Sequence, residues 1–217
     1  MLTRNDQTVT DCLDVFEIIK NTGLKHVGFK DIGVSKDTLK KLNKNIKNAG
    51  MTSYLEVVST SNEACLESAK AAKEVGIDRL MGGTNASEIL KIIKNEKIEY
   101  YPFPGRPEGH PTKLGGTPEE VEKHCKDFIS MGCAGVDLLA YRATESDPIE
   151  LAKAAKKGLG DSGLLICAGS VDTPEKIKKL RDAGTDLFTI GSAAFDGSFS
   201  PAKGSLNHQI EDILKAT

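Results

Sequence analysis

Hydrophobic positions along this chain follow two spacings, a period of about two residues in short runs and about 3.6 residues in longer ones. The short runs predict strands at residues 1–4, 26–31, 53–58, 78–83, 100–103, 135–141, 164–169 and 186–191. Amphipathic segments that predict helices lie between these runs. Strands that alternate with helices indicate βα units, which build a parallel sheet with right-handed crossovers.

Two of the helices begin with the same tripeptide, Thr-Pro-Glu, at Thr117 and at Thr173. Each threonine is predicted to cap its helix, with proline at the first helical position. Both segments finish in a glycine, so they should extend through residues 117–132 and 173–184. Further helices are predicted within residues 11–23 and 61–76.

Eight βα units of similar length favour a single-domain (β/α)8 TIM barrel over residues 1–217. Corresponding positions in three strands, Lys30, Glu56 and Gly82, follow one another at intervals of 26 residues. The weak point of the barrel prediction is its first strand, which would begin at the first residue. A doubly wound open sheet of seven strands is therefore kept as the alternative. No G-x-G-x-x-G pattern follows the first strand, which weighs against that alternative.

Acidic and basic residues are mixed along the chain, which has a net charge of −2 and a pI of about 6.1. This mixture predicts no nucleic-acid or membrane partner, so a small molecule is the expected ligand. The opening MLTRNDQTVTD lacks the blocks of a signal peptide, and no apolar run reaches the roughly 18 residues of a membrane span. We expect a soluble cytoplasmic protein, and leave homo-oligomer formation open.

The chain has five cysteines, an odd number without a C-x-x-C pair, which disfavours a disulfide framework or a zinc site. They fall within the strand and helix patterns and are predicted to be reduced core residues: Cys12, Cys65, Cys125, Cys133 and Cys167.

The last two predicted strands each end in a Gly-Ser pair, Gly169-Ser170 and Gly191-Ser192. At the C-terminal ends of barrel strands, glycine lets a ligand approach backbone N–H groups, and serine adds a hydroxyl. A short helix that begins near Ser192 would direct more N–H groups to the same place. The matched pair predicts a phosphate site, whereas one such turn alone would be read as a strand end.

The segment LLICAGSVDTPEKIKKLRDAGTDLFTIGSAAF, residues 164–195, resembles the closing quarter of the ribulose-phosphate-binding barrels. This TIM-barrel superfamily includes sugar-phosphate epimerases, isomerases and decarboxylases. The resemblance implies a phosphorylated substrate held by the two Gly-Ser turns. It does not select the reaction, because these barrels support many.

Strand parity places three ionisable side chains inside the predicted barrel. Apolar side chains at alternate positions face the helices, so Lys30, Glu56 and Asp137 face inward. A lysine beside carboxylates in a partly dry cavity suits proton abstraction next to a carbonyl, or Schiff-base formation. A structural ion pair for Lys30 and Glu56, and bonding between strands for Asp137, are the alternatives.

Residues 104–120 form the longest predicted connection without regular structure, after the fifth strand. Long loops on this side of a barrel often cover substrate, so a lid is expected, with a solvated loop as the alternative. In it Arg106 and Lys113 could bind an anion, and His110 is a candidate acid or base. Candidate substrate-binding residues at strand ends are Arg4, Arg142 and Tyr141, the last of which strand parity turns inward. If the first strand forms, Asn5 and Asp6 also lie at the mouth beside Arg4.

No cofactor is predicted, and the loop glycines lack the spacing of a P-loop. The chain has no H-E-x-x-H or His-x-His pattern, so no metal site is assigned. A divalent metal held by Glu56, Asp137 and a histidine is left open.

The leading hypothesis is an isomerase or epimerase that transfers a proton at carbon in a small phosphorylated sugar or sugar acid. Glu56 or Lys30 would move the proton, and the other would orient or polarise the carbonyl. The alternative is a class I aldolase or lyase, in which Lys30 forms an imine. A third hypothesis is a phosphometabolite-binding barrel without catalysis.

Overall fold

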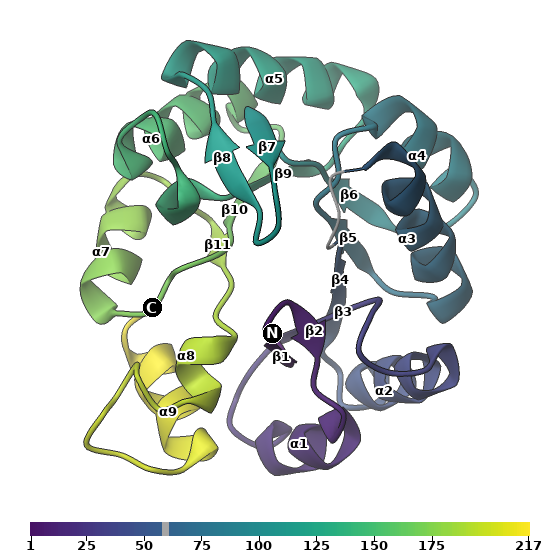
Figure 1. Cartoon of the computed structure of the whole chain (residues 1–217), viewed down its shortest axis with the longest axis vertical. Helices are drawn as coiled ribbons and strands as arrows, with labels where there is room; N and C mark the ends of the chain where they lie inside the picture. Colours follow the sequence, from purple (N-terminus) through teal and green to yellow (C-terminus); the bar gives the residue numbers. More distant parts are fainter. Residues whose placement is uncertain (58–60) are drawn as a thin grey trace.

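The computed structural model describes residues 1–57 and 61–217, and Figure 1 shows their parallel strands in a ring within a layer of helices. Residue 58, the end of the third predicted strand, lies outside the described residues. The strands of the ring are β1 (Thr3–Arg4), β3 (His26–Lys30), β4 (Thr52–Glu56), β5 (Arg79–Met81), β6 (Glu99–Tyr101), β9 (Gly135–Leu138), β10 (Leu164–Cys167) and β11 (Leu187–Phe188).

Backbone hydrogen bonds join two parallel sheets of this ring, β3-β4-β5-β6 and β9-β10-β11. The Ala134 nitrogen donates to the Tyr100 carbonyl at 2.9 Å, and the Asp137 nitrogen donates to the Pro102 carbonyl at 3.0 Å. Strand β6 is therefore hydrogen-bonded to strand β9, and the two sheets are continuous at this side.

The first residues of the chain close the other side of the ring. The Leu2 nitrogen donates to the Gly28 carbonyl of β3, and the Met1 nitrogen donates to the Ile190 carbonyl just after β11, both at 2.7 Å. A Cβ on Gly28 would lie 2.2 Å from the Met1 sulfur, so glycine lets the first strand approach. The predicted (β/α)8 barrel is confirmed, and the doubly wound alternative is wrong.

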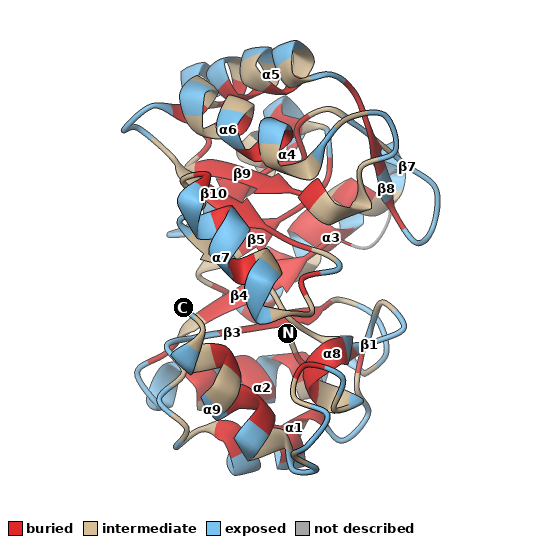
Figure 2. Cartoon of the chain, turned by 90° about the vertical axis from the view of Figure 1, so that its left-hand side faces the viewer, coloured by how far each residue is buried: buried red, intermediate tan, exposed pale blue. Residues whose placement is uncertain are grey.

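An outer layer of helices turns its apolar faces toward the ring, where Figure 2 shows buried residues in red. The helices predicted within residues 11–23, 61–76, 117–132 and 173–184 are confirmed. The layer consists of α1 (Cys12–Ile19), α2 (Lys36–Asn48), α3 (Asn62–Val75), α4 (Ala86–Ile93), α5 (Pro118–Met131), α6 (Pro148–Leu159), α7 (Pro174–Asp182), the short α8 (Ser192–Phe195) and α9 (Leu206–Lys215).

The core lies between strands and helices, and it is mainly aliphatic. Leu55 on β4, Leu80 on β5, Val136 on β9 and Leu165 on β10 are fully buried. Their alternation with inward-facing residues is the period-two pattern of the sequence. All five cysteines are buried, which confirms that they are core residues.

Both Thr-Pro-Glu helices begin as predicted. The Thr117 side chain accepts a hydrogen bond from the Glu120 nitrogen, and the Glu120 side chain accepts one from the Thr117 nitrogen. This reciprocal capping box satisfies two N–H groups that the first helical turn leaves without partners. Thr173 caps α7 through the Lys176 nitrogen.

Replacing Thr117 with alanine should lower the free energy of unfolding by about 1 kcal/mol, because the cap loses its acceptor. Chemical denaturation of both proteins measures this difference. Ser130→Ala removes an exposed hydroxyl from the end of the same helix and should change stability by less than about 0.5 kcal/mol. Equal losses in the two variants would contradict the assigned cap.

The structure departs from the predicted pattern in several segments. The connection 104–120 contains an antiparallel hairpin, β7 (Arg106–Glu108) with β8 (Lys113–Gly115), so it is not structureless. The strand predicted at 135–141 ends at Leu138, since residues 140–142 form a 3-10 turn, η1 (Ala140–Arg142). A second hairpin pairs β1 with β2 (Gln7–Thr8), which the sequence pattern did not predict.

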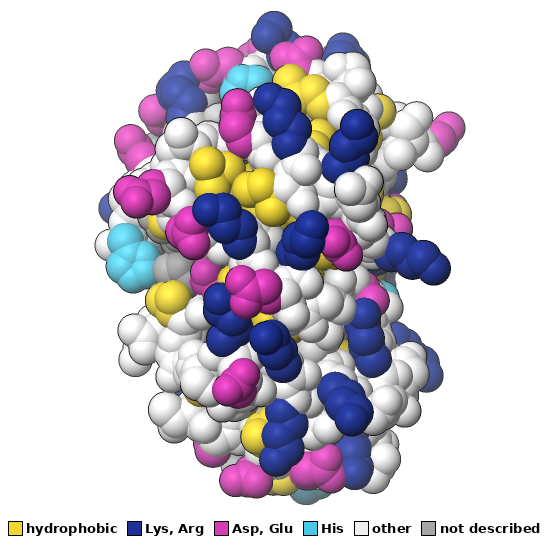
Figure 3. Space-filling view, turned by 90° about the vertical axis from the view of Figure 1, so that its right-hand side faces the viewer, with side chains coloured by type: hydrophobic (Ala, Val, Ile, Leu, Met, Phe, Trp, Pro, Cys, Tyr) yellow, Lys and Arg dark blue, Asp and Glu magenta, His cyan; other side chains and the backbone are white. Residues whose placement is uncertain are grey.

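The surface carries charges of both signs, and Figure 3 shows lysines and arginines interspersed with acidic residues on the side of α2, α3 and α4. Lys36 of α2 pairs with Glu74 of α3, and Lys73 of α3 pairs with Glu96 in the segment after α4. Among the described helices, none has the length and apolar character needed to cross a membrane.

Candidate active site

Lys30 and Glu56 lie opposite each other at the C-terminal ends of neighbouring strands β3 and β4. Both side chains are buried, with exposed fractions of 6% and 11%, and Lys30 Nζ lies 3.7 Å from Glu56 Oε2. The two residues predicted from strand parity are therefore together inside the barrel. Their distance leaves room for a substrate atom to contact both.

A third partner, Asp6, comes from the turn of the β1–β2 hairpin. Its Oδ1 accepts a hydrogen bond from Lys30 Nζ at 2.7 Å. Both turn residues, Asn5 and Asp6, have positive φ, 48° and 57°, as a two-residue type I′ turn requires. The Thr8 hydroxyl anchors the hairpin beside the site, because it donates to the Lys30 carbonyl and accepts from the Lys30 nitrogen.

Asp6 is held as a carboxylate by the cations around it. Partial burial alone would raise its pKa, but the hydrogen bond and charge of Lys30, together with Arg142 and His110, lower the pKa below the usual value. Sequence reasoning placed Asp6 at the barrel mouth but assigned it no role in the site. The available signal was Asn-Asp between two short β-prone segments, a dipeptide suited to a tight hairpin turn.

Asp137 on β9 lies below this cluster and is completely buried. Within the described part of the chain, neither of its carboxyl oxygens has a hydrogen-bond partner. Burial raises the pKa of Asp137 well above the ordinary value, and the charge of Glu56 raises it further. Both effects favour the neutral form of this side chain, which lies within the electrostatic reach of Lys30 and Glu56.

The two Gly-Ser turns meet at one cavity of about 270 Å³ whose lining also includes Lys30 and Glu56. Gly169, Ser170, Gly191 and Ser192 all line it, together with Arg142. The α8 helix begins at Ser192, as the sequence predicted. One continuous space thus connects the ionisable cluster to both turns.

Arg142, on η1 after β9, lies directly over the first of these turns. A Cβ on Gly169 would be 2.5 Å from Arg142 Nε, so the absence of a side chain lets the guanidinium pack there. Arg142 also donates to the Thr112 carbonyl, and its Nη2 lies 3.8 Å from Asp6 Oδ1. The guanidinium is placed to meet an anion that enters the turn.

Two acidic side chains in the cavity lining are already engaged. Asp172 pairs with Lys176 at 2.8 Å, and the same Lys176 Nζ donates to the Ser170 carbonyl. Asp196 accepts a hydrogen bond from the Ser198 nitrogen at 2.9 Å. These contacts offset part of the negative charge that would oppose an incoming phosphate.

Several sequence candidates lie outside the cavity lining. Arg4 donates to the Phe195 carbonyl, and Tyr141 donates to the Lys176 carbonyl, because the strand has ended before Tyr141 and parity no longer applies. Arg106 pairs with Glu120 at 2.6 Å. Its assignment to an anion-binding lid therefore has no support from these contacts.

The two other loop candidates, His110 and Lys113, are exposed on the β7–β8 hairpin. His110 contributes its charge to the environment of Asp6 but does not line the cavity. In the described parts of the chain, no group of three His, Cys, Asp or Glu side chains is placed to hold a metal ion.

Replacing Gly169 with alanine should weaken binding of inorganic phosphate about tenfold, because the new methyl group displaces Arg142 from the turn. The residue also has φ +77°, so the variant should lose about 1 kcal/mol of stability. Calorimetric titration with phosphate measures the first effect, and thermal unfolding measures the second.

Gly132→Ala is a matched control, since Gly132 has φ +97° and its Cβ would meet nothing within 4 Å. It should lose similar stability while phosphate affinity stays unchanged. Equal phosphate affinity in both variants would remove the first Gly-Ser turn from the binding site.

No family model and no curated protein matches this chain. Solved structures do resemble it. Orotidine 5'-phosphate decarboxylase from Pyrococcus horikoshii OT3 is 11% identical, with a TM-score of 0.63 over 94% of this chain and 92% of that one. N-acetylmannosamine-6-phosphate 2-epimerase from Clostridium perfringens is 14% identical, with a TM-score of 0.62 over 97% and 90%.

A putative deoxyribose-phosphate aldolase from Coccidioides immitis is also similar, at 13% identity and a TM-score of 0.58 over 85% of this chain and 74% of that one. The chain shares the TIM-barrel fold of these three proteins, the fold that the resemblance of residues 164–195 implied. The three proteins are named for decarboxylation, epimerisation and aldol chemistry. The similarity therefore establishes the fold of this chain. The reaction has to be inferred from the side chains of this site.

Proposed function

We propose that this barrel is an enzyme that transfers a proton at carbon in a small phosphorylated sugar or sugar acid, as an isomerase or epimerase. One observation carries the proposal: a single cavity holds the Lys30–Glu56 pair and is lined by both Gly-Ser turns. A phosphate in the turns would leave the rest of a short substrate lying over the ionisable pair. The similar sugar-phosphate barrels support this substrate class.

In the proposed reaction, the Glu56 carboxylate removes a proton from the carbon next to the substrate carbonyl. The Lys30 ammonium donates a hydrogen bond to the carbonyl oxygen, which becomes negatively charged as the proton leaves. Return of the proton to the former carbonyl carbon, while the proton of the adjacent hydroxyl passes to the former carbonyl oxygen, gives isomerisation. Delivery of a proton to the opposite face of the original carbon gives epimerisation. Asp6 keeps Lys30 Nζ in place through its 2.7 Å hydrogen bond.

The second candidate is the aldolase or lyase, because Lys30 is a buried amine in a cavity. Imine formation needs the free amine, whereas Lys30 makes ion pairs with both Asp6 and Glu56. This arrangement favours Lys30 as a hydrogen-bonding cation over Lys30 as a nucleophile. The proton-transfer mechanism is therefore proposed first.

A thermal-shift screen of phosphorylated aldoses, ketoses and sugar acids would identify the ligand, since a molecule that binds only the folded state raises the melting temperature. NMR of the stabilising compound in D2O then tests the reaction. Replacement of the hydrogen next to the carbonyl by deuterium, at a rate proportional to enzyme, is the expected result.

Two outcomes would replace the proposal. Borohydride reduction that leaves a permanent substrate adduct on Lys30 would establish the imine mechanism. Binding without exchange, cleavage or adduct would establish a phosphometabolite-binding barrel without catalysis.

A further inference from the structure

The last strand of the barrel is incompletely covered. Leu187 and Phe188 of β11 and the following Ile190 are only partly buried. By contrast, Leu165 and Ile166 on the neighbouring β10 have exposed fractions of 1% or less. The helix that follows β11 is a single turn, and α9 packs beside it (Figure 1). Apolar side chains of an inner strand therefore border an open space.

That space is a second cavity of about 350 Å³, between β11, the first strand, α1 and α9. Its volume is in the range of small-molecule sites. The lining is predominantly apolar and includes Ile19, Leu24, Phe188, Phe195, Ile210 and Leu214. Water gains few hydrogen bonds in such a lining, so an apolar occupant is favoured over solvent.

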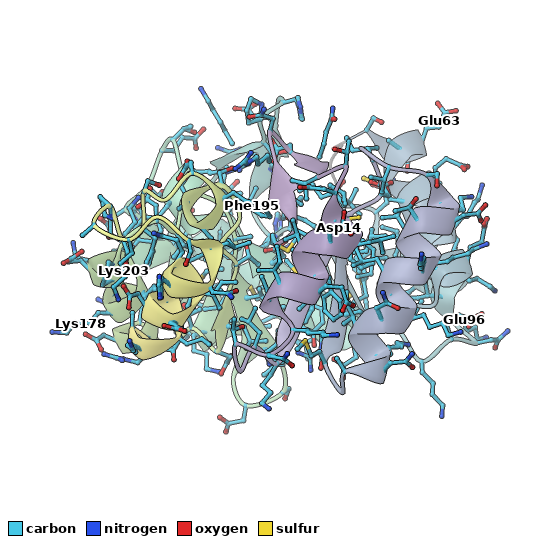
Figure 4. The ribbon with its side chains drawn as sticks, turned by 90° about the horizontal axis from the view of Figure 1, so that it is seen from below. Asp14, Glu63, Glu96, Lys178, Phe195 and Lys203 are labelled. Atoms are coloured by element: carbon cyan, nitrogen blue, oxygen red, sulfur yellow. The ribbon has the colours of Figure 1, made fainter. Side chains whose placement is uncertain are left out.

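The second cavity adjoins the candidate active site: Met1 and Thr189 line both cavities, and α8 stands between them. Ser192 and Ala193 line the active-site cavity, whereas Ala194 and Phe195 line the apolar one. Figure 4 shows Phe195 between the C-terminal helices and the N-terminal segment of the chain. The Arg4 guanidinium stacks on the Phe195 ring at 5.2 Å, which fixes this part of the wall.

Most polar groups in the lining of the second cavity have partners. His26 Nδ1 and the Tyr54 hydroxyl are hydrogen-bonded at 2.9 Å, and burial lowers the pKa of His26, which favours the neutral ring. Asp186 is paired with Lys156 at 3.0 Å. Lys25 is exposed and, within the described residues, makes no ion pair, so a cation remains available at the rim.

We propose that this cavity binds a single-chain amphipathic anion such as a fatty acid, with its hydrocarbon chain along Phe188 and Ile210 and its carboxylate at Lys25. The apolar lining accounts for the chain, and the unpaired cation accounts for the charge. The site is separate from phosphate binding and does not depend on the proposed reaction.

The chain contains no tryptophan, so Phe188→Trp introduces a single reporter into the cavity. Titration with decanoate should shift its emission to shorter wavelength in a saturable way, because the hydrocarbon chain displaces water from the indole. Met131→Trp places the reporter on the exposed end of α5, away from this cavity, and should show no saturable shift. Equal shifts at both positions would indicate surfactant-like adsorption and overturn the proposal.

Calorimetric titration of the unmodified protein tests the proposal independently of any reporter. Decanoate should bind at one site and should not compete with inorganic phosphate. Lys25→Met should weaken decanoate binding about threefold and leave decanol binding unchanged.

Absence of decanoate binding, or competition with phosphate, would overturn the proposal. A Phe188→Trp emission that shifts with protein concentration alone would also overturn it, because a second copy of the chain would then cover the cavity.

Discussion

A Glu56→Gln variant should lose about a hundredfold to ten-thousandfold in kcat, the usual contribution of a positioned general base. The amide has the shape of the carboxylate but cannot accept the substrate proton at neutral pH. Phosphate affinity should remain, because the Gly-Ser turns lie elsewhere in the cavity. Steady-state kinetics with the substrate found in the ligand screen, together with deuterium exchange, measures the loss.

Glu211→Gln on the exposed face of α9 is the matched control and should retain full turnover. A fall in kcat of less than tenfold in the Glu56 variant would remove Glu56 from the role of base. Loss of phosphate affinity at unchanged kcat would instead assign Glu56 to substrate binding.

Asp137→Asn should change how stability depends on pH. The raised pKa of Asp137 in the folded protein means that, above about pH 4, the unfolded chain releases this proton while the folded chain keeps it. Folding then loses up to about 1.4 kcal/mol of stability for each pH unit until the folded carboxyl also ionises. Asparagine does not titrate, so the variant should gain stability relative to the parent as pH rises.

Guanidinium unfolding of parent and variant at pH 5, 6 and 7 measures this difference. The constant offset between the proteins reflects packing of the amide, and only the change with pH tests the protonation state. Asp161→Asn, at an exposed position, should follow the parent at every pH. Parallel curves for Asp137→Asn would mean that the buried group is ionised throughout this range.

The sequence predicted the elements that depend on local pattern. Period-two runs placed Lys30 and Glu56 on the inner face because each lies in a regular strand with apolar neighbours. The Thr-Pro-Glu signals placed two helix starts because capping is decided within four residues. The Gly-Ser turns could be paired because the C-terminal ends of all barrel strands share one side.

The remaining features depend on contacts between distant segments. Asp6 reaches Lys30 only because the first strand folds back as a hairpin inside the barrel mouth. The spacing of hydrophobic residues does not predict this hairpin. Tyr141 was assigned to the substrate as a residue of a strand through 135–141, but the strand ends at Leu138 and the chain then turns. Arg106 was assigned to an anion, but its partners are acidic residues from α5 and from the segment after η1.

Ser170 has φ +57°, a backbone conformation that costs a residue with a side chain about 1 kcal/mol or more. Glycine would adopt it without that cost, so exchanging Ser170 for glycine should make the barrel more resistant to heat. The same exchange removes a hydroxyl from the wall of the active-site cavity. Engineering for thermostability that relies on backbone geometry would therefore choose glycine here and remove a hydroxyl from the proposed phosphate site.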